Sequence, residues 1–206
     1  MKYSKQSDDE QKISNGPIVN EKFKNILSYL HDVVFGLVGV LLVFMLVFRI
    51  VVVFGPSMNK TLFQGDCLIV LSNVFYKNPK CGDIVVASKD SFKDGEPIIK
   101  RVIATEGQKV DIDFEKGIVY VDDVALVEPY TNTPTNLYEG MNFPLIVDEG
   151  CVFLLGDNRN NSTDSRSMEI GQIDCRELLG KALFIALPGV ESSTGKRDFN
   201  RIGVLQ

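Results

Sequence analysis

The most constraining feature of this sequence is a long apolar run near its N-terminus. Residues 33–48 contain no charged side chain, and after Arg49 the apolar character continues to Phe54. The run is comparable in length to the roughly 17–25 residues of a helix that crosses a bilayer. Arg49 lies near one end of the run, where its long side chain can reach the lipid headgroups. The run therefore predicts a single membrane-spanning anchor.

Two other interpretations of the run are weaker. A cleaved signal peptide has an apolar core of about 7–15 residues and ends in small residues, whereas residues 53–55 form a poor cleavage site. A buried core helix is the other alternative, because the run has no polar face. Lysines are frequent before the run, and only Arg49 and Lys60 follow it closely. The positive-inside rule then places the N-terminus in the cytoplasm and the later residues outside.

Composition divides the chain into three parts. Residues 1–31 are predicted to be a cytoplasmic tail, disordered to about residue 20 and then entering a helix. Residues 32–54 are the predicted transmembrane anchor, and residues 55–206 are long enough for one extracytoplasmic domain. A hydrophobic content of 45% is sufficient for a core, and the net charge of −5 argues against nucleic acid as a partner.

The pattern beyond the anchor is mostly β. Short apolar or alternating runs are separated by turns that contain Gly or Pro. Such a pattern predicts a mainly β fold of the barrel or sandwich type, with one short helix at about residues 174–179. The predicted strands cover residues 67–71, 83–87, 98–104, 110–113, 118–121, 124–126, 151–155 and 181–187.

Histidine and cysteine limit the chemistry. The one histidine, His31, precedes the anchor, so a Ser-His or Cys-His pair outside the membrane is almost excluded. The four cysteines, Cys67, Cys81, Cys151 and Cys175, form no close pair of the kind that binds zinc. An extracytoplasmic location permits a disulfide, but the sequence does not give its pairing. Four buried free thiols are the alternative.

Ser57 and Lys100 are the candidate catalytic pair. Ser57 follows Gly55-Pro56, which can present a hydroxyl on a rigid turn, although an ordinary loop has the same composition. A serine nucleophile needs a base, and burial can lower the pKa of a lysine toward neutrality. Lys100 lies within the apolar run 98–103, on the strand face opposite Arg101. Arg101 is expected to face solvent or to pair with an acid, and an edge-strand lysine is the alternative for Lys100.

A third segment, residues 156–166, consists entirely of polar residues and glycine. This density of hydrogen-bonding groups indicates a loop whose own side chains hold it in one shape. Asp164 and Arg166 are placed to pair within it, and Ser162 could exchange a hydrogen bond with a neighbouring base. A solvated surface loop is the alternative.

Taken together, these segments resemble the bacterial type I signal peptidases, a family of serine-lysine peptidases. Residues 156–166 are the most specific match, residues 55–66 are moderately specific, and residues 100–107 are a short match at the correct place. The three segments also occur in the family's order, after the anchor. The resemblance covers nearly the whole chain after residue 30.

The resemblance implies roles for individual residues. Ser57 matches the family's nucleophile and Lys100 its general base. Ser162 matches the serine that orients the lysine, and Asp164 and Arg166 match positions that brace the site. The family pattern further implies a monomeric, single-pass membrane enzyme that cleaves signal peptides from secretory preproteins beside membrane lipid. It implies no metal and no organic cofactor.

The chain departs from the family pattern at a few positions. Lys60 replaces the usual proline and brings a second amine close to Ser57, and Gly55 implies that backbone N–H groups alone form an oxyanion hole. Two alternative functions remain. One is a soluble, self-cleaving repressor of the serine-lysine type, against which the anchor argues. The other is a catalytically inactive, membrane-anchored relative that acts in surface-protein assembly.

Overall fold

A computed structural model describes residues 21–191 and 194–205 of the chain, apart from the side chains of Lys22 and Lys93. The described residues form two compact units, which divide between Val43 and Phe44. The predicted disorder of residues 1–20 lies outside the described part of the chain.

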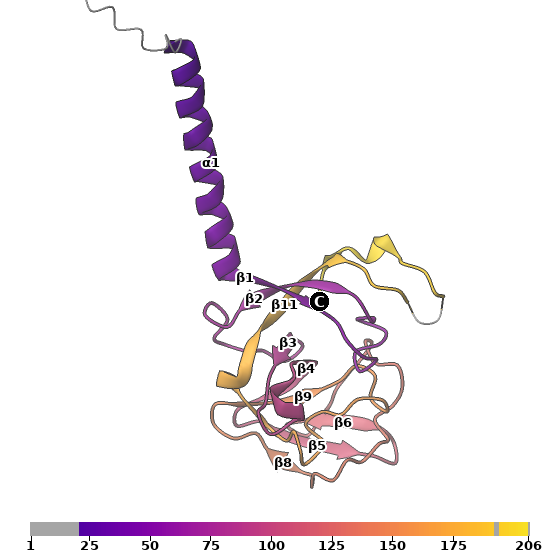
Figure 1. Cartoon of the computed structure of the whole chain (residues 1–206). Helices are drawn as coiled ribbons and strands as arrows, with labels where there is room; N and C mark the ends of the chain where they lie inside the picture. Colours follow the sequence, from indigo (N-terminus) through magenta and orange to yellow (C-terminus); the bar gives the residue numbers. More distant parts are fainter. Residues whose placement is uncertain (1–20, 192–193, 206) are drawn as a thin grey trace, which may run out of the picture. The chain divides into compact units, whose positions relative to one another are not determined.

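Helix α1 spans Glu21–Val47 and forms one continuous helix (Figure 1). Its 25-residue stretch Phe23–Val47 is long and apolar enough to cross a membrane. Almost every described side chain in α1 is exposed, and a helix that is apolar on all sides suits a lipid environment better than water. The helix begins close to Lys22, as the sequence predicted.

The predicted anchor, residues 32–54, is helical only up to Val47. The chain then continues as strand β1 (Phe48–Val52), which pairs antiparallel with β2 (Cys67–Ser72). The β-branched residues of β1 favour an extended backbone. Arg49 lies opposite Val70 in this ladder, so it belongs to the sheet and not to the end of the helix. One apolar run therefore supplies two different elements.

Two antiparallel sheets make up the β-rich unit. In the larger sheet the strands follow the order β1-β2-β11-β3-β4-β9-β10, and β12 pairs with β11. The remaining strands of this sheet are β3 (Ile84–Ala87), β4 (Ile98–Thr105), β9 (Cys151–Leu155), β10 (Ile173–Asp174), β11 (Leu178–Leu187) and β12 (Gly203–Val204). The smaller sheet has the order β7-β6-β5-β8. Its strands are β5 (Lys109–Asp113), β6 (Ile118–Val121), β7 (Val124–Ala125) and β8 (Leu145–Ile146).

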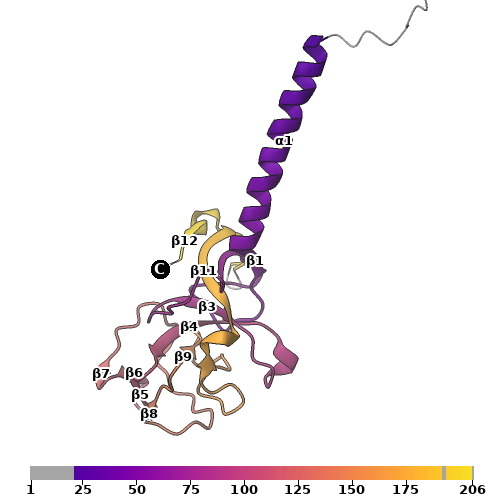
Figure 2. The same ribbon diagram turned by 90° about the vertical axis from the view of Figure 1, so that its left-hand side faces the viewer.

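The core of this unit lies between curved sheet faces. Both ribbon views show β5, β6 and β8 together beside β4 and β9 (Figures 1 and 2). Buried side chains of β4 and β9, such as Ile103 and Phe153, pack there against Val110 and Val119 of the smaller sheet. A second cluster joins β1, β2, β3 and β11 and includes the buried Met58 and Leu62. The segment that contains Ser57 is therefore anchored in the core.

The structure confirms a mainly β fold with one N-terminal apolar helix. Every predicted strand has a counterpart within a few residues. The predicted short helix is a 3-10 turn, η2 (Cys175–Glu177), capped by Asp174. The two-residue strands β8, β10 and β12 were not predicted, because so few residues give no periodic pattern.

Candidate active site

Ser57 lies in a connecting segment between β1 and β2, which we call the serine turn (residues 55–66). Gly55 has a φ of 80°, a backbone conformation that favours glycine, and its N–H donates to Gln64 Oε1 at 2.9 Å. The N–H of Leu62 donates to the carbonyl of Met58 at 2.8 Å, and both side chains are buried. The Ser57 hydroxyl is thus carried on a backbone that is held at several points.

Lys100 reaches Ser57 from strand β4. Its side chain is 4% exposed, and its Nζ lies 2.8 Å from Ser57 Oγ, within hydrogen-bonding distance. Strand β4 lies between β3 and β9, so the alternative of an edge-strand lysine is wrong. The fold brings together two side chains that are 43 residues apart in the chain.

The pair lines a cavity of about 490 Å³. The polar residues of its wall are Ser57, Glu96, Lys100, Asn161, Ser162 and Thr163. A few polar groups within apolar walls are typical of a site that binds and orients a ligand. The apolar, Gly and Pro residues of the wall are Val51, Val52, Phe54, Gly55, Pro56, Phe92, Pro97, Ile98 and Ile99.

Arg101, the neighbour of Lys100, is buried and pairs with an acid. Its Nε and Nη2 donate to the two carboxylate oxygens of Asp157 at 2.9 and 2.8 Å. The guanidinium also stacks on the Tyr130 ring, 4.0 Å from its centroid. The hydroxyl of Thr61 donates to Asp157 Oδ2 at 2.5 Å. Asp157 therefore connects β4 to the serine turn.

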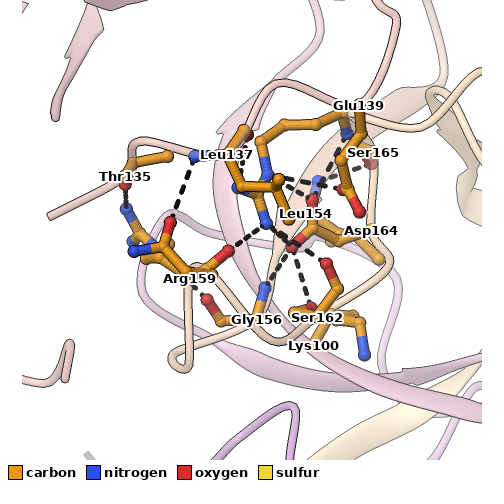
Figure 3. Close-up of polar contacts among 12 residues, drawn as sticks. Lys100, Thr135, Leu137, Glu139, Leu154, Gly156, Arg159, Ser162, Asp164 and Ser165 are labelled. Atoms are coloured by element: carbon orange, nitrogen blue, oxygen red, sulfur yellow. Dashed lines mark hydrogen bonds and ion pairs between the residues drawn. The ribbon is translucent and has the colours of Figure 1, made fainter. Parts of the chain in front are cut away.

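The polar segment 156–166 is a buried loop held by its own side chains. Asp164 and Arg166 are both fully buried, and Arg166 Nε and Nη2 each donate to Asp164 at 2.8 Å. The Ser162 hydroxyl and the Gly156 N–H also donate to Asp164 Oδ2, at 2.9 and 3.0 Å (Figure 3). The alternative of a solvated surface loop is wrong, and the predicted pairing of Asp164 with Arg166 is confirmed.

Gly156 is the point where this loop meets the serine turn. A Cβ at this position would lie 2.2 Å from Ser162 Oγ and 2.6 Å from the carbonyl oxygen of Ser57. The same carbonyl accepts a hydrogen bond from the Asn158 N–H at 2.9 Å. The absence of a side chain at Gly156 therefore lets the loop and the turn approach each other closely.

Comparison with known proteins identifies the family of the chain. The family model described as "Signal peptidase, peptidase S26" matches residues 26–187 of the chain. The chain belongs to the signal peptidase family S26. The match covers most of α1, the serine turn, Lys100 and the whole loop 156–166.

Bacterial proteins named as signal peptidases are similar to the chain. A "Probable signal peptidase I-1" of Synechocystis is 38% identical over 142 residues, which cover 65% of this chain and 68% of the relative. A "Signal peptidase I" of Bacillus licheniformis is 29% identical over 175 residues, 81% of this chain and 91% of the relative. A crystal structure of a signal peptidase I from Enterococcus faecalis is 28% identical and covers 51% of this chain and 97% of its own, with a TM-score of 0.43.

Lys60, the second amine that the sequence placed close to Ser57, binds a different part of the molecule. Its Nζ donates to the carbonyls of Pro129 and Thr131, at 2.6 and 3.1 Å. Its backbone has a φ of 88°, which is uncommon for a residue with a Cβ. The amine of Lys60 thus links the serine turn to residues 129–131.

Two acidic residues of the site were missed at the level of sequence. Glu128 pairs with the buried Arg159, and Glu139 Oε2 lies 3.7 Å from Arg166 Nε. Glu139 Oε2 is also buried without a hydrogen-bond partner. Burial, and then the charge of Asp164, raise the pKa of Glu139 to about 6. Neither glutamate belongs to a motif, so no local pattern could have revealed them.

The four cysteines are free thiols in this signal peptidase family member. Cys81 is exposed and the other three are partly buried, so the alternative of four buried thiols is wrong. Burial raises the pKa of the Cys81, Cys151 and Cys175 thiols. Within residues 21–191 and 194–205, no group of three or more His, Cys, Asp or Glu side chains is placed to hold a metal ion.

Proposed function

We propose that this chain is a membrane-bound serine endopeptidase that removes N-terminal signal peptides from secretory preproteins, with Ser57 as nucleophile and Lys100 as general base. The observation that carries this proposal is the 2.8 Å separation of Lys100 Nζ and Ser57 Oγ at an apolar cavity. This distance suits direct proton transfer between the two groups. Membership of the signal peptidase family supports the choice of substrate.

In the proposed mechanism the uncharged amine of Lys100 accepts the proton of Ser57 as Oγ attacks the scissile carbonyl. The tetrahedral intermediate collapses, Lys100 gives the proton to the leaving amine, and an acyl-enzyme remains. Water, deprotonated by the same amine, then attacks the ester and releases the cleaved signal peptide. Backbone N–H groups, including that of Ser57, stabilise the oxyanion.

The remaining site residues position this pair. Ser162 shares the cavity wall with Lys100 and is itself fixed by Asp164, so it is placed to orient the amine. Asp164 and Arg166 hold the loop that carries Ser162. The apolar wall of the cavity suits small side chains of the substrate near the scissile bond.

The enzyme works at a membrane surface in this proposal. Helix α1 anchors it once, with the N-terminus in the cytoplasm and the β-rich unit on the extracytoplasmic side. Confinement of enzyme and substrate to one bilayer raises their encounter frequency. The proposed enzyme is a monomer that contacts lipid and preprotein and needs neither nucleic acid nor a cofactor.

A preprotein cleavage assay tests the assignment of the pair. We expect Ser57→Ala to abolish cleavage and Lys100→Ala to lower kcat by about 10²–10⁴-fold, because general acid-base catalysis contributes about that much. The matched control is Lys60→Ala, which removes an amine from the serine turn that binds Pro129 and Thr131. The Lys60 variant should keep most of the activity. Loss of activity in Lys60→Ala with normal activity in Lys100→Ala would show that the base is misassigned.

Covalent labelling distinguishes the proposed enzyme from the alternative of a catalytically inactive assembly factor. A penem that acylates reactive serines should modify the wild-type protein once, at Ser57, and should not modify Ser57→Ala. Mass spectrometry of the intact protein measures this labelling. Absence of labelling together with absence of preprotein cleavage would favour the inactive alternative.

A further inference from the structure

The C-terminal segment lies outside the part of the chain that the family model matches, residues 26–187. It returns to the large sheet through the 3-10 turn η3 (Phe199–Arg201) and strand β12, where Val204 lies opposite Phe184 of β11. The N–H of Leu205 donates to the carbonyl of Leu183 at 2.9 Å. These contacts fix the end of the segment next to β11 and place Arg201 over the serine turn.

Arg201 binds the serine turn through several contacts. Its Nη1 and Nη2 donate to the two carboxylate oxygens of Asp66, at 2.9 and 2.6 Å. Its Nη2 also donates to the carbonyl of Thr61 at 3.0 Å. The guanidinium lies over the ring of Phe63, 4.3 Å from the centroid. A forked cation is required here, because a lysine ammonium could not bind both carboxylate oxygens and stack on the ring in the same way.

Asp66 is the buried partner at the centre of these contacts. It is 0% exposed, and it accepts further hydrogen bonds from the N–H groups of Phe63 and Gly189, at 2.8 and 2.6 Å. The chain at Gly189 passes so close that a Cβ there would lie 2.1 Å from the carbonyl oxygen of Gln64. A buried carboxylate is costly unless it is paired, so Arg201 stabilises the turn in one conformation.

The same turn is held from its other side by the catalytic strand. Thr61 offers its carbonyl to Arg201 and its hydroxyl to Asp157, and Asp157 is paired with Arg101, the neighbour of Lys100. The turn that carries Ser57 is therefore fixed between the C-terminal segment and strand β4.

We propose that Arg201 is a positioning residue for catalysis, which clamps the serine turn through Asp66 and Thr61 and so maintains the alignment of Ser57 with Lys100. This inference rests on the proposed function, since it assigns Arg201 to the same Ser57–Lys100 pair. Loss of the clamp should leave the substrate cavity in place, because Arg201 does not line it. It should allow Ser57 to move relative to Lys100.

The test measures steady-state cleavage of a preprotein and the rate of acylation by a penem, in detergent or lipid, with the full chain. For Arg201→Met we expect kcat to fall by about 10- to 100-fold, the order of loss that small misplacements of reacting groups cause. KM should stay within about twofold, because substrate binding is not the step affected. The acylation rate should fall with kcat, and Arg201→Lys should recover part of both losses.

Arg197→Gln is the matched control. It removes a guanidinium from the same segment, whose Nη1 donates to the carbonyl of Pro188, and it should leave kcat unchanged. Arg201→Met leaves the buried carboxylate of Asp66 without its cation. The double variant Arg201→Met/Asp66→Asn also removes the charge of that carboxylate, so it takes the place of Arg201→Met in the assay if the single variant fails to fold. Values of kcat are compared only for protein that is folded by circular dichroism at the assay temperature.

Two results would overturn the inference. The first is a wild-type kcat and a wild-type acylation rate in every folded variant among Arg201→Met, Arg201→Lys and the double variant. The other is a rise in KM with unchanged kcat, which would assign Arg201 to substrate binding. Ser57→Ala is assayed beside them. If Ser57→Ala retains cleavage, the proposed function itself fails, whereas inactive Ser57→Ala with fully active Arg201 variants rejects the clamp alone.

Discussion

Ser57 and Lys100 are each held from more than one direction. The carbonyl of Ser57 accepts a hydrogen bond from the Asn158 N–H, and its hydroxyl faces Lys100 Nζ at 2.8 Å. Lys100 and Arg101 leave β4 on opposite faces, so that one strand supplies an amine to the cavity and a guanidinium to Asp157. Single residues at these contacts therefore have little freedom to change.

The substitution Gly156→Ala tests the close contact between the loop 156–166 and the serine turn. The new Cβ would overlap Ser162 and the Ser57 carbonyl, and overpacking of this kind costs about 1–3 kcal/mol. We expect a destabilised protein with strongly reduced kcat, as measured by urea unfolding and preprotein cleavage. Gly203→Ala is the control, because a Cβ at Gly203 would meet no atom within 4 Å. Normal activity in Gly156→Ala would show that the loop and the turn can move apart without harm.

At the scale of elements, most of the loop 156–166 is buried, although Asn160, Asn161 and Thr163 are exposed. Its buried charged side chains have partners both inside and outside the loop: Arg166 donates to Asp164 and to the carbonyls of Arg159 and Leu137, the last two at 2.6 and 3.0 Å. Buried polar networks rigidify a structure when every member is paired. The loop can therefore present Ser162 to the cavity with the precision of a regular element.

Arg166→Met tests the loop as a unit. It leaves the buried Asp164 carboxylate without its cation, and breaking a buried ion pair in this way costs about 3–5 kcal/mol. We expect a large fall in the free energy of unfolding and a loss of cleavage activity. Arg176→Met is the control, because Arg176 is exposed and surface pairs contribute little. Equal stability of the two variants would contradict the structural role of the loop.

At the scale of the whole molecule, strong charges are paired inside the β-rich unit. Coulomb attraction is larger in this poorly solvated interior than at the surface, and it offsets the cost of desolvation. Glu139 is held less closely than the other acids of these pairs, since its buried Oε2 lies 3.7 Å from Arg166 Nε and has no hydrogen-bond partner. The internal pairs are Arg101–Asp157, Arg159–Glu128, Arg166–Asp164 and Arg201–Asp66.

Glu139 makes the stability of the molecule depend on pH. Burial raises its pKa from 4.5 to about 6, so between these values the folded state binds the proton more tightly than the unfolded state. Its contribution to stability is therefore present below pH 4.5 and is lost as the pH rises through about 6. Relative to the wild type, Glu139→Gln should become more stable as the pH rises through this window. Unfolding by urea at several pH values measures the difference. A flat difference for Glu139→Gln would contradict the shift.

Sequence patterns were sufficient to predict those features that depend on residues close together in the chain. Alternating apolar residues predicted the strands, and the motifs named Ser57, Lys100 and the 156–166 loop. They could not divide the apolar run between α1 and β1, because a helix in lipid and a paired strand both accept Val and Ile. Hydropathy does not show which segments of a chain pair in a sheet. Residues 48–52 form a strand because they pair with β2.

Residue types and spacing by themselves predicted the mainly β fold, the apolar N-terminal helix and Ser57 and Lys100 as candidates, and the resemblance to the signal peptidases then favoured this pair over an ordinary loop and an edge-strand lysine. Only the tertiary structure decided which charges pair across the chain. Glu128, Glu139 and Arg201 reach the site from segments with no recognisable motif. Their roles depend on burial and on the direction of side chains from distant elements, and these properties arise only when the chain is folded.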